Sequence, residues 1–427
     1  MVDKKTTDDD SPKKWTWIVA MVIVAVIAFS AGYFPFHSTT TSSSSTVNIE
    51  FYESVASSEA AFINNTLIPQ FETEYPGIHV TFINVGSEGV SKDILALEAS
   101  GHVGSIVAGQ DNLEIGQLIY SSSGNVLMNL TPMAQALMPS SLIPAAANLV
   151  NYEKKVFGGV YFFPFRGNVP LVFYNKTMFS NAGIETPPGN YTQLLQDAKI
   201  IKSKTGQNAI MIQGASTNGG HTGSSTATEL YQMMVQFGGN PLYLNDTGDI
   251  MAIQELYNLS SYFSPDFKTG YWGSYHGLAV GNHLLGGDVL FIPKGATNVP
   301  ALESFIRFLL GAQAQRETLI NLSWVAINAN AYKDLPASQS VVFTALEQAI
   351  ATGVFLRNPT PWITEWQVIL CNDVFNPVFV THLKGYSDIP SLLSNAHEAM
   401  YQYILTNYGQ TNATLYQNPN NYAPISV

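Results

Sequence analysis

The segment PFRGNVPLVFYNKTMFSNAGIETPPGNYTQLLQDAKIIKSKTG, residues 164–206, sets the expected fold. Residues 171–174 form an apolar and aromatic run without charge, which is typical of a buried strand. A short helix that ends at Gly183 follows, and Pro187-Pro188-Gly189 then forces an extended turn. The next apolar residues recur at helical spacing and predict a long amphipathic helix: Leu194, Leu195, Ala198 and Ile201. Strand, short helix, turn and long helix predict an α/β protein.

The order of residue types in this segment resembles a family signature. A Tyr-Asn-Lys strand end, residues 174–176, precedes a Phe, an Ala-Gly pair, a Pro-Pro pair and an aromatic residue that opens the long helix. This order is similar to that of extracellular solute-binding proteins of the ABC sugar-transporter type (family 1), the relatives of maltose-binding protein. The usual Thr-Trp of the helix start is Asn190-Tyr191 here. Further matches extend over residues 47–405, among them a Gly-Gly turn at residues 237–240.

The resemblance implies a two-lobed α/β fold of the periplasmic-binding-protein type (type II), with the ligand cleft between the lobes. The chain then crosses between lobes near Pro164, Val289 and Trp324. These crossings assign residues 47–164 and 293–333 to lobe 1, and residues 165–292 and 334–427 to lobe 2. A length of 427 residues also favours two domains over a single core.

The N-terminal residues predict a membrane tether. A hydrophilic tail, residues 1–14, precedes residues 15–36, which carry no charge and are long enough to cross a bilayer as one transmembrane helix. Lys13 and Lys14 place the tail in the cytoplasm, so the rest of the chain lies outside, anchored at the cell surface in the cytoplasmic membrane. Residues 37–46 form a Ser/Thr-rich linker. The alternative is a cleaved signal peptide, with a small-residue site at residues 28–30.

Charged residues are scarce, at 12% of the chain, and the net charge at pH 7 is −12. This acidic balance argues against nucleic acid as a partner, because nucleic-acid binding needs a basic face. A chain with few basic residues gains little net positive charge in acid, which predicts a shallow pH dependence of stability. This composition also predicts an archaeal, acid-exposed cell surface. The single cysteine, Cys371, excludes an intrachain disulfide and is expected to be a small buried hydrophobe.

Asn-x-Ser/Thr sequons recur downstream of the export signal and indicate an N-glycosylated outer surface. The predicted glycosylation sites are Asn64, Asn129, Asn190, Asn245, Asn258, Asn321 and Asn412. Asn175 carries a further sequon, but its place at the end of the predicted strand is expected to bury it.

Polar residues follow three predicted strands, at residues 47–52, 78–85 and 104–108. Strand–helix–strand spacing implies parallel pairing, and ligands of open parallel sheets gather at the carboxyl ends of the strands. The candidate ligand contacts at these ends are Glu53, Ser87, Glu88 and Asp111. The alternative for each is ordinary helix capping or turn chemistry.

Aromatic residues in the second half of the chain suggest the chemistry of the ligand. Sugars present apolar C–H faces and hydroxyl groups, which flat aromatic rings and polar side chains bind in a preformed cleft. The candidates for such contacts are Trp272, Trp324, Trp362, Tyr271, His221 and Arg166. The resemblance favours Trp362, because in maltose-binding protein an aromatic at the start of a C-terminal helix stacks on the sugar. The alternatives are a core pair of Trp362 with Trp366 on one helix, and a local carboxylate partner for Arg166.

Enzyme signatures do not occur in the sequence: Gly-x-Ser-x-Gly, His-Glu-x-x-His and a Gly-Lys-Ser/Thr phosphate loop are missing. His276 and His283 stand apart from other ligands, whereas zinc needs three or four, so neither a metal nor a cofactor is predicted. The resemblance implies a binding protein that captures a mono- or oligosaccharide by hinge closure and delivers it to ABC permease subunits with a separate ATPase chain. The alternatives are a secreted, membrane-anchored glycan-active enzyme, and the same fold binding a non-sugar solute such as a peptide.

Overall fold

The computed structural model describes residues 46–86, 89–167, 174–212, 214, 224–268, 283–284, 287–333, 335–336, 344 and 354–426. The predicted tail, membrane segment and most of the linker, residues 1–45, lie outside these ranges, as do residues 171–173 of the predicted strand. Within the described ranges, no helix is both long and apolar enough to cross a membrane.

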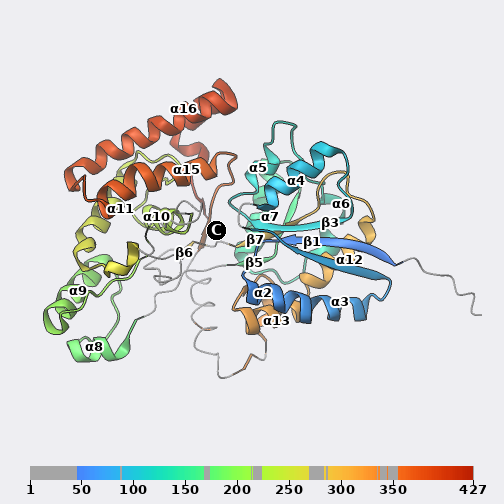
Figure 1. Cartoon of the computed structure of the whole chain (residues 1–427), viewed down its shortest axis with the longest axis horizontal. Helices are drawn as coiled ribbons and strands as arrows, with labels where there is room; N and C mark the ends of the chain where they lie inside the picture. The colour runs from blue at the N-terminus through green and yellow to red at the C-terminus, as the bar shows by residue number, and fades with distance from the viewer. Residues whose placement is uncertain are drawn as a thin grey trace, which may run out of the picture. The chain divides into compact units, whose positions relative to one another are not determined.

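A five-stranded sheet with the order β2-β1-β3-β7-β4 organises the first group of elements (Figure 1). Its strands are β1 (Val47–Glu53), β2 (Ile78–Asn84), β3 (Ile106–Asp111), β4 (Phe162–Pro164) and β7 (Asp288–Phe291). β1 is parallel to both β2 and β3, which confirms the pairing predicted from the strand–helix–strand spacing. β7 is antiparallel to β3 and β4, so it enters the sheet at the edge where β3 ends.

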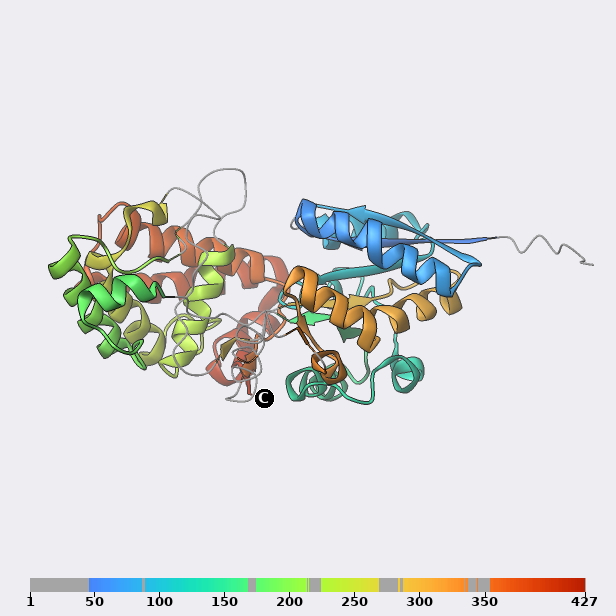
Figure 2. The same cartoon turned by 90° about the horizontal axis from the view of Figure 1, so that it is seen from below.

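Helices cover both faces of this sheet. They are α2 (Ser57–Phe62), α3 (Ile68–Glu74), α4 (Gly89–Ser100), α5 (Gly116–Ile119), α6 (Thr131–Leu137), α7 (Pro144–Val156), α12 (Val299–Leu309) and α13 (Ala312–Leu322). Val107 and Leu290 point into the layer that contains α3 and α12, which lie side by side in Figure 2. Their neighbours Ile106 and Val289 point into the opposite layer with α4 and α7, as side chains alternate along a strand. These two layers together are called the sheet core.

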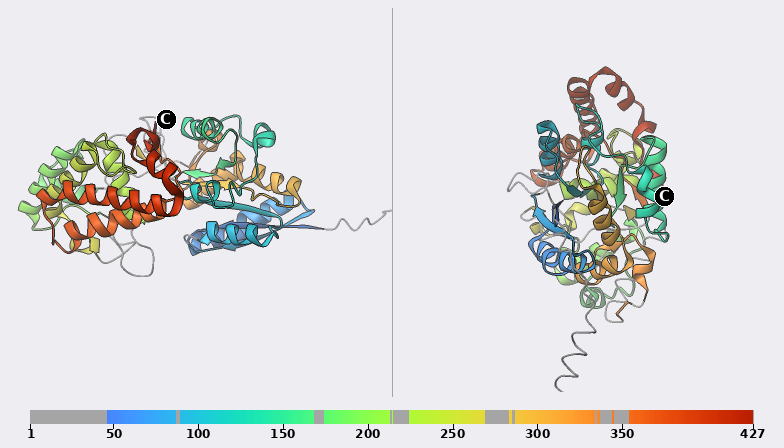
Figure 3. Two further views of the ribbon diagram at one scale, coloured as in Figure 1. Left: turned by 90° about the horizontal axis from the view of Figure 1, so that it is seen from above. Right: turned by 90° about the vertical axis from the view of Figure 1, so that its right-hand side faces the viewer.

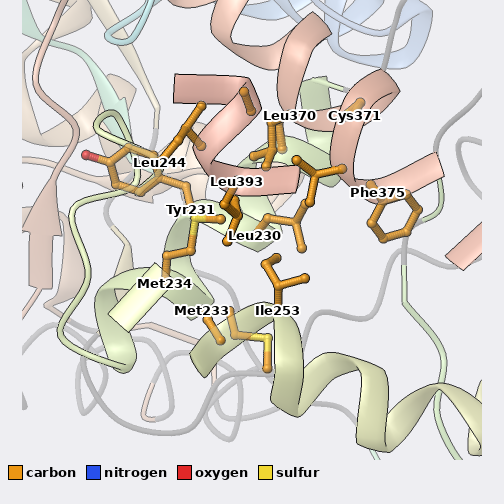
Figure 4. Packing of buried hydrophobic residues seen from close by; sticks show 14 of the residues in the cluster. Leu230, Tyr231, Met233, Met234, Leu244, Ile253, Leu370, Cys371, Phe375 and Leu393 are labelled. Carbon is orange, nitrogen blue, oxygen red and sulfur yellow. The ribbon is translucent and has the colours of Figure 1, made fainter. Parts of the chain in front are cut away.

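A second group of helices forms a separate apolar cluster, called the helical core. These helices are α9 (Tyr191–Thr205), α10 (Ser224–Gln236), α11 (Thr247–Leu259), α15 (Ile363–Ile369), the π-helix η6 (Leu370–Val380) and α16 (Ile389–Tyr416). The short helix α8 (Lys176–Ala182) packs against α9. The sequence predicts that Met233 and Met234 of α10 serve core packing, and both lie here with Ile253 and Phe375 (Figure 4). Cys371 is buried in the same cluster, and this burial raises the pKa of its thiol to about 12.

Short elements complete the described chain. They are β5 (Arg166–Gly167), β6 (His283–Leu284), β8 (Val325–Ala326), β9 (Val354–Leu356), β10 (Ile425–Ser426), η1 (Ile63–Leu67), η2 (Ser260–Tyr262), η3 (Pro265–Lys268), η4 (Ala329–Tyr332), η7 (Tyr386–Asp388) and η8 (Pro419–Tyr422). β5 pairs with β8, and β9 lies between β10 and β6 in a second small sheet. The chain therefore leaves the large sheet directly after β4 and forms β5, which pairs with the much later strand β8.

The segment that set the expected fold forms the predicted helices. The Asn175 and Asn190 side chains cap α8 and α9 by accepting hydrogen bonds from backbone N–H groups at 3.0 and 2.9 Å. Both helices end at a glycine with φ of 72°, Gly183 and Gly206, a left-handed conformation that glycine adopts without strain.

Three predictions from the sequence are wrong in detail. The sequence predicts one helix over about residues 57–75, but this segment contains the π-helical turn η1, because Pro69 has no N–H to donate to the preceding turn. The sequence also predicts that Asn298 caps a helix, but Asn298 makes no capping bond before α12, and its side chain donates to Ser105 Oγ at 2.9 Å. The Asn-, Tyr- and Pro-rich residues after Tyr408 predict a chain that winds over the surface, yet α16 resumes beyond Gly409 and buries Tyr416.

Two carboxyl groups lie buried in the cores without a basic partner among the described residues. Glu153 Oε2 accepts from the backbone N–H groups of Tyr161 and Phe162 at 2.8 and 3.1 Å, and burial raises the pKa of this carboxyl well above its ordinary value. Asp249 is fully buried beside Asp246, and burial followed by the charge of Asp246 raises the pKa of Asp249 as well. The folded protein therefore favours the neutral form of both acids.

We expect the buried carboxyl group of Glu153 to stabilise the fold more as the pH falls. A carboxyl group whose folded pKa is raised stabilises the fold fully below its unfolded pKa, about 4.3 for Glu, and this contribution is lost as the pH rises through the folded value. Glu153→Gln keeps a neutral group at every pH. The free energy of unfolding of the wild type should fall by more than about 1 kcal/mol between pH 4 and pH 7 relative to this variant.

Urea denaturation at each pH measures this difference. Glu185→Gln, at an exposed carboxyl, is the matched control and should follow the wild type. Parallel pH profiles for the wild type and Glu153→Gln would contradict the neutral state of Glu153.

Candidate functional site

Acidic side chains meet at the edge of the sheet where the parallel strands end. Glu53 is the last residue of β1 and Asp111 the last residue of β3. Asp288 is the first residue of β7 and pairs in register with Asp111, because β7 runs in the opposite direction. The expectation that strand ends would gather polar groups also included Ser87 and Glu88 after β2, which lie outside the described residues, and Asp288 adds a carboxyl that was not expected.

Arg166 is the cation at the centre of this edge. Its guanidinium forms an ion pair with the Asp288 carboxylate, and its Nη1 lies 3.6 Å from Glu59 Oε1. The guanidinium carbon lies 4.2 Å from the ring centre of Trp324, whose Nε1 donates to the same Glu59 oxygen at 2.6 Å. Arg166 thus has the local carboxylate partners that were the alternative to a ligand contact, and its contact with a ligand stays a prediction. Trp324 is buried, and its contact with a ligand also stays a prediction.

Glu53 lies beneath this pair and is almost fully buried. Its Oε1 accepts from the Ser54 N–H at 3.1 Å, while its Oε2 lies so close to Gly109 that a Cβ at that position would be 1.7 Å away. Burial, then repulsion from Asp288, raises the pKa of Glu53 well above its ordinary value. Burial also raises the pKa of Asp288 despite the neighbouring Arg166.

Arg357 joins this edge to the helical core. Its Nη2 donates to Asp111 Oδ1 at 2.7 Å and to Asn112 Oδ1 at 3.2 Å. Its Nη1 donates to Thr228 Oγ1 of α10 at 3.2 Å. Gln117 Nε2 makes a further link, to Thr364 Oγ1 at 2.8 Å. Arg357 is 3% exposed, so this bridge is shielded from solvent.

Sequence reasoning missed Arg357, Asp288 and Glu59. The chain contains only four arginines, and two of them, Arg166 and Arg357, lie at this edge. Because charged residues make up only 12% of the chain, each arginine was a candidate for the site. Asp288 was the corresponding candidate among the acidic residues, because it directly precedes the apolar residues of β7.

The aromatic candidate Trp362 lies at the start of α15 and is 2% exposed. Its ring contacts three tyrosine rings, with Tyr422 nearest at 5.0 Å between ring centres and Tyr408 and Tyr416 farther away. Trp366 is also buried and donates from Nε1 to the Pro241 carbonyl at 2.8 Å. In this structure both tryptophans pack in the helical core, and a ligand contact of Trp362 stays a prediction.

The remaining candidates are distributed differently. Outside the described residues lie Ser87, Glu88, His221, Tyr271 and Trp272. Among the sequons, Asn64, Asn129, Asn190, Asn258 and Asn321 are exposed, whereas Asn245 and Asn412 are half-buried. The expected burial of Asn175 was wrong, because the residue caps α8 through its side-chain oxygen and stays exposed.

A small apolar cavity of about 30 Å³ lies in the helical core. It is lined by Tyr191, Ile212, Thr226, Glu229, Leu230, Met233, Leu256 and Phe375. Ligand pockets for molecules of drug size are ten times larger or more, on the order of 300 to 1,000 Å³. This cavity is therefore too small to hold a sugar.

Solved structures share this fold. Maltose-bound MalE3 of T. maritima is 18% identical with a TM-score of 0.67, over 83% of this chain and 100% of that one. The sugar-binding protein MalE of Xanthomonas citri is 15% identical with a TM-score of 0.67, over 84% and 100%. The GacH receptor of Streptomyces glaucescens is 18% identical with a TM-score of 0.63, over 85% and 99%. These likenesses define a two-lobed α/β fold of the periplasmic-binding-protein type.

The sequence itself shows the family. Residues 56–316 match the family described as bacterial extracellular solute-binding protein, and the chain belongs to this family. The family prediction made from residues 164–206 is thereby confirmed. A binding protein of Brucella abortus (strain 2308) is 39% identical over 51 residues, and this match covers 12% of the chain and only 12% of the relative's length.

We expect Arg166→Met to destabilise the protein at neutral pH by about 3–5 kcal/mol, because it leaves buried carboxylates without their cation. The loss should be smaller at pH 4, where protonation removes the negative charge of Asp288 that Arg166 balances. Urea denaturation at the two pH values measures both effects.

Arg316→Met is the control, because the Arg316 guanidinium donates to the Ala331 and Asn330 carbonyls at 3.3 Å and is half-buried. An equal loss for Arg166→Met at pH 4 and pH 7 would mean that packing on Trp324, and not the ion pair, is what the residue contributes.

Proposed function

We propose that this protein is the extracellular substrate-binding component of an ABC transporter and that its ligand is a mono- or oligosaccharide. The observation that carries the proposal is the polar edge of Glu53, Asp111 and Arg166, which faces the helical core across the Arg357 bridge. In open α/β sheets, ligands bind outside the carboxyl ends of the strands. The three solved structures described above support a sugar, since they are maltose-bound MalE3, a receptor solved with acarbose and the sugar-binding protein MalE.

Hinge closure is the proposed mechanism. The separate sheet and helical cores support two lobes, but the expected boundary after residue 292 comes too late, because β7 is a strand of the large sheet and its side chains pack in the sheet core. The lobes we propose are therefore residues 47–164 with 288–333 and residues 165–287 with 334–427. A ligand that bridges the lobes shifts the equilibrium from open to closed. The closed form then docks on the permease subunits, whose ATPase is a separate chain.

The proposed ligand contacts combine polar groups with flat aromatic faces. They are Glu53, Ser87, Glu88, Asp111, Arg166, His221, Tyr271, Trp272, Trp324 and Trp362. Donors and acceptors at the sheet edge suit sugar hydroxyl groups, and aromatic rings suit the apolar C–H faces.

The proposed location is the outer face of the cytoplasmic membrane. Residues 15–36 serve as the anchor, residues 37–46 as the tether, and the sequons of the outer domain carry glycans. The low proportion of charged residues supports an acid-exposed surface.

We expect binding without turnover. A thermal-shift screen against mono- and oligosaccharides should raise the melting temperature with at least one of them, since ligand binding stabilises the folded state. Chromatography of that sugar after prolonged incubation with the protein should recover it unchanged. Steady conversion to products would favour the glycan-active enzyme, and stabilisation by peptides alone would favour the peptide-binding alternative.

Trp362→Ala should weaken sugar binding at least tenfold, because stacking aromatics at such sites contribute on the order of 1–3 kcal/mol. Trp362→Phe retains an aromatic face and should retain most of the affinity. Calorimetry measures binding, and circular dichroism checks that the variants fold. Wild-type affinity in a folded Trp362→Ala protein would show that the residue serves the core alone.

A further inference from the structure

The chain does not end with α16 but continues as residues 418–426, called the C-terminal strap. It consists of the short helix η8 and the strand β10, and follows the long red helix of Figure 3. At its start, Asn240 Nδ2 of the helical core donates to the Pro419 carbonyl. The strap is thus fastened to the α10–α11 turn.

The far end of the strap is fastened to different elements. β10 pairs antiparallel with β9, joining Ile425 to Leu356 and Ser426 to Phe355. Ile425 also packs against the layer of the sheet core that contains α4 and α7. The strap therefore runs from the helical core to the sheet core and adds a connection to those made near β5 and β8.

Between these two ends the strap covers Trp362. The Tyr422 ring lies 5.0 Å from the Trp362 ring, centre to centre, with an angle of 80° between the planes. It is the nearest of the three tyrosine rings around Trp362. Tyr422 itself is only half-buried, so this part of the cover borders on solvent.

We propose that the C-terminal strap is a built-in competitor of the saccharide for Trp362, an inference that rests on the proposed function. A sugar that stacks on Trp362 must take the place of the Tyr422 ring, and the strap moves aside as the sugar binds. The free protein then spends part of its time in a covered state that cannot bind the sugar. The apparent association constant equals the intrinsic constant multiplied by the fraction of protein that is uncovered. The ligand expected here has an apolar C–H face that replaces the aromatic contact.

Tyr422→Ala tests the competition. Acrylamide quenching of tryptophan fluorescence in the ligand-free protein should increase, and this increase should disappear when Trp362 is also replaced by Phe. Affinity for the saccharide found by the screen should rise at least threefold. Tyr386→Ala removes a tyrosine that is 45% exposed and lies against Tyr257, and should change neither measurement.

Asn240→Ala is a second variant, which releases the strap at Pro419 without touching either ring. It should change both measurements in the same direction by a smaller amount, and it keeps the test decisive if Tyr422→Ala does not fold. A saccharide that binds the wild type but binds both variants no more tightly overturns the strap proposal alone. If no saccharide in the screen binds the wild type or Tyr422→Ala, the proposed function fails and the competition fails with it.

Discussion

The rest of the structure depends on the buried ion pair of Arg166 with Asp288, which lies where the chain leaves and re-enters the large sheet. Here β4 ends, β5 leaves the large sheet, and β7 enters between β3 and β4. Four carboxyl groups approach this place, and burial raises the pKa of two of them. A single guanidinium with two carboxylate partners, packed on Trp324, allows the chain to cross out of the sheet without leaving an isolated buried charge.

The same edge connects the fold to its proposed activity. Arg357 donates hydrogen bonds both to Asp111 at the sheet edge and to Thr228 of α10. Hydrogen bonds therefore connect the sheet edge to the helical core. The C-terminal strap forms a separate connection, and Tyr422 places an aromatic ring where a ligand ring is proposed. In the proposed mechanism, the ligand replaces contacts that the free protein makes within itself, and its different affinities for the two states shift the population.

Much of the fold could be predicted from the sequence, because its signals are local. Gly183, Gly206, Asn175 and Asn190 mark helix ends through backbone conformation and capping, and the parallel strands follow from their spacing. The site was harder to predict, since its partners are brought together only by the tertiary structure. Glu59 and Trp324 are 265 residues apart, and no pattern in the sequence joins them. The burial of Trp362 beside Tyr422 likewise depends on a C-terminal segment whose Asn-, Tyr- and Pro-rich composition predicted a path over the surface.

Small-angle X-ray scattering of the protein with and without a saccharide tests the central claim most directly. The account predicts a smaller radius of gyration at saturating ligand, because a sugar that bridges the two lobes favours the closed state. An unchanged radius of gyration with a sugar that calorimetry shows to be bound would contradict closure between the lobes.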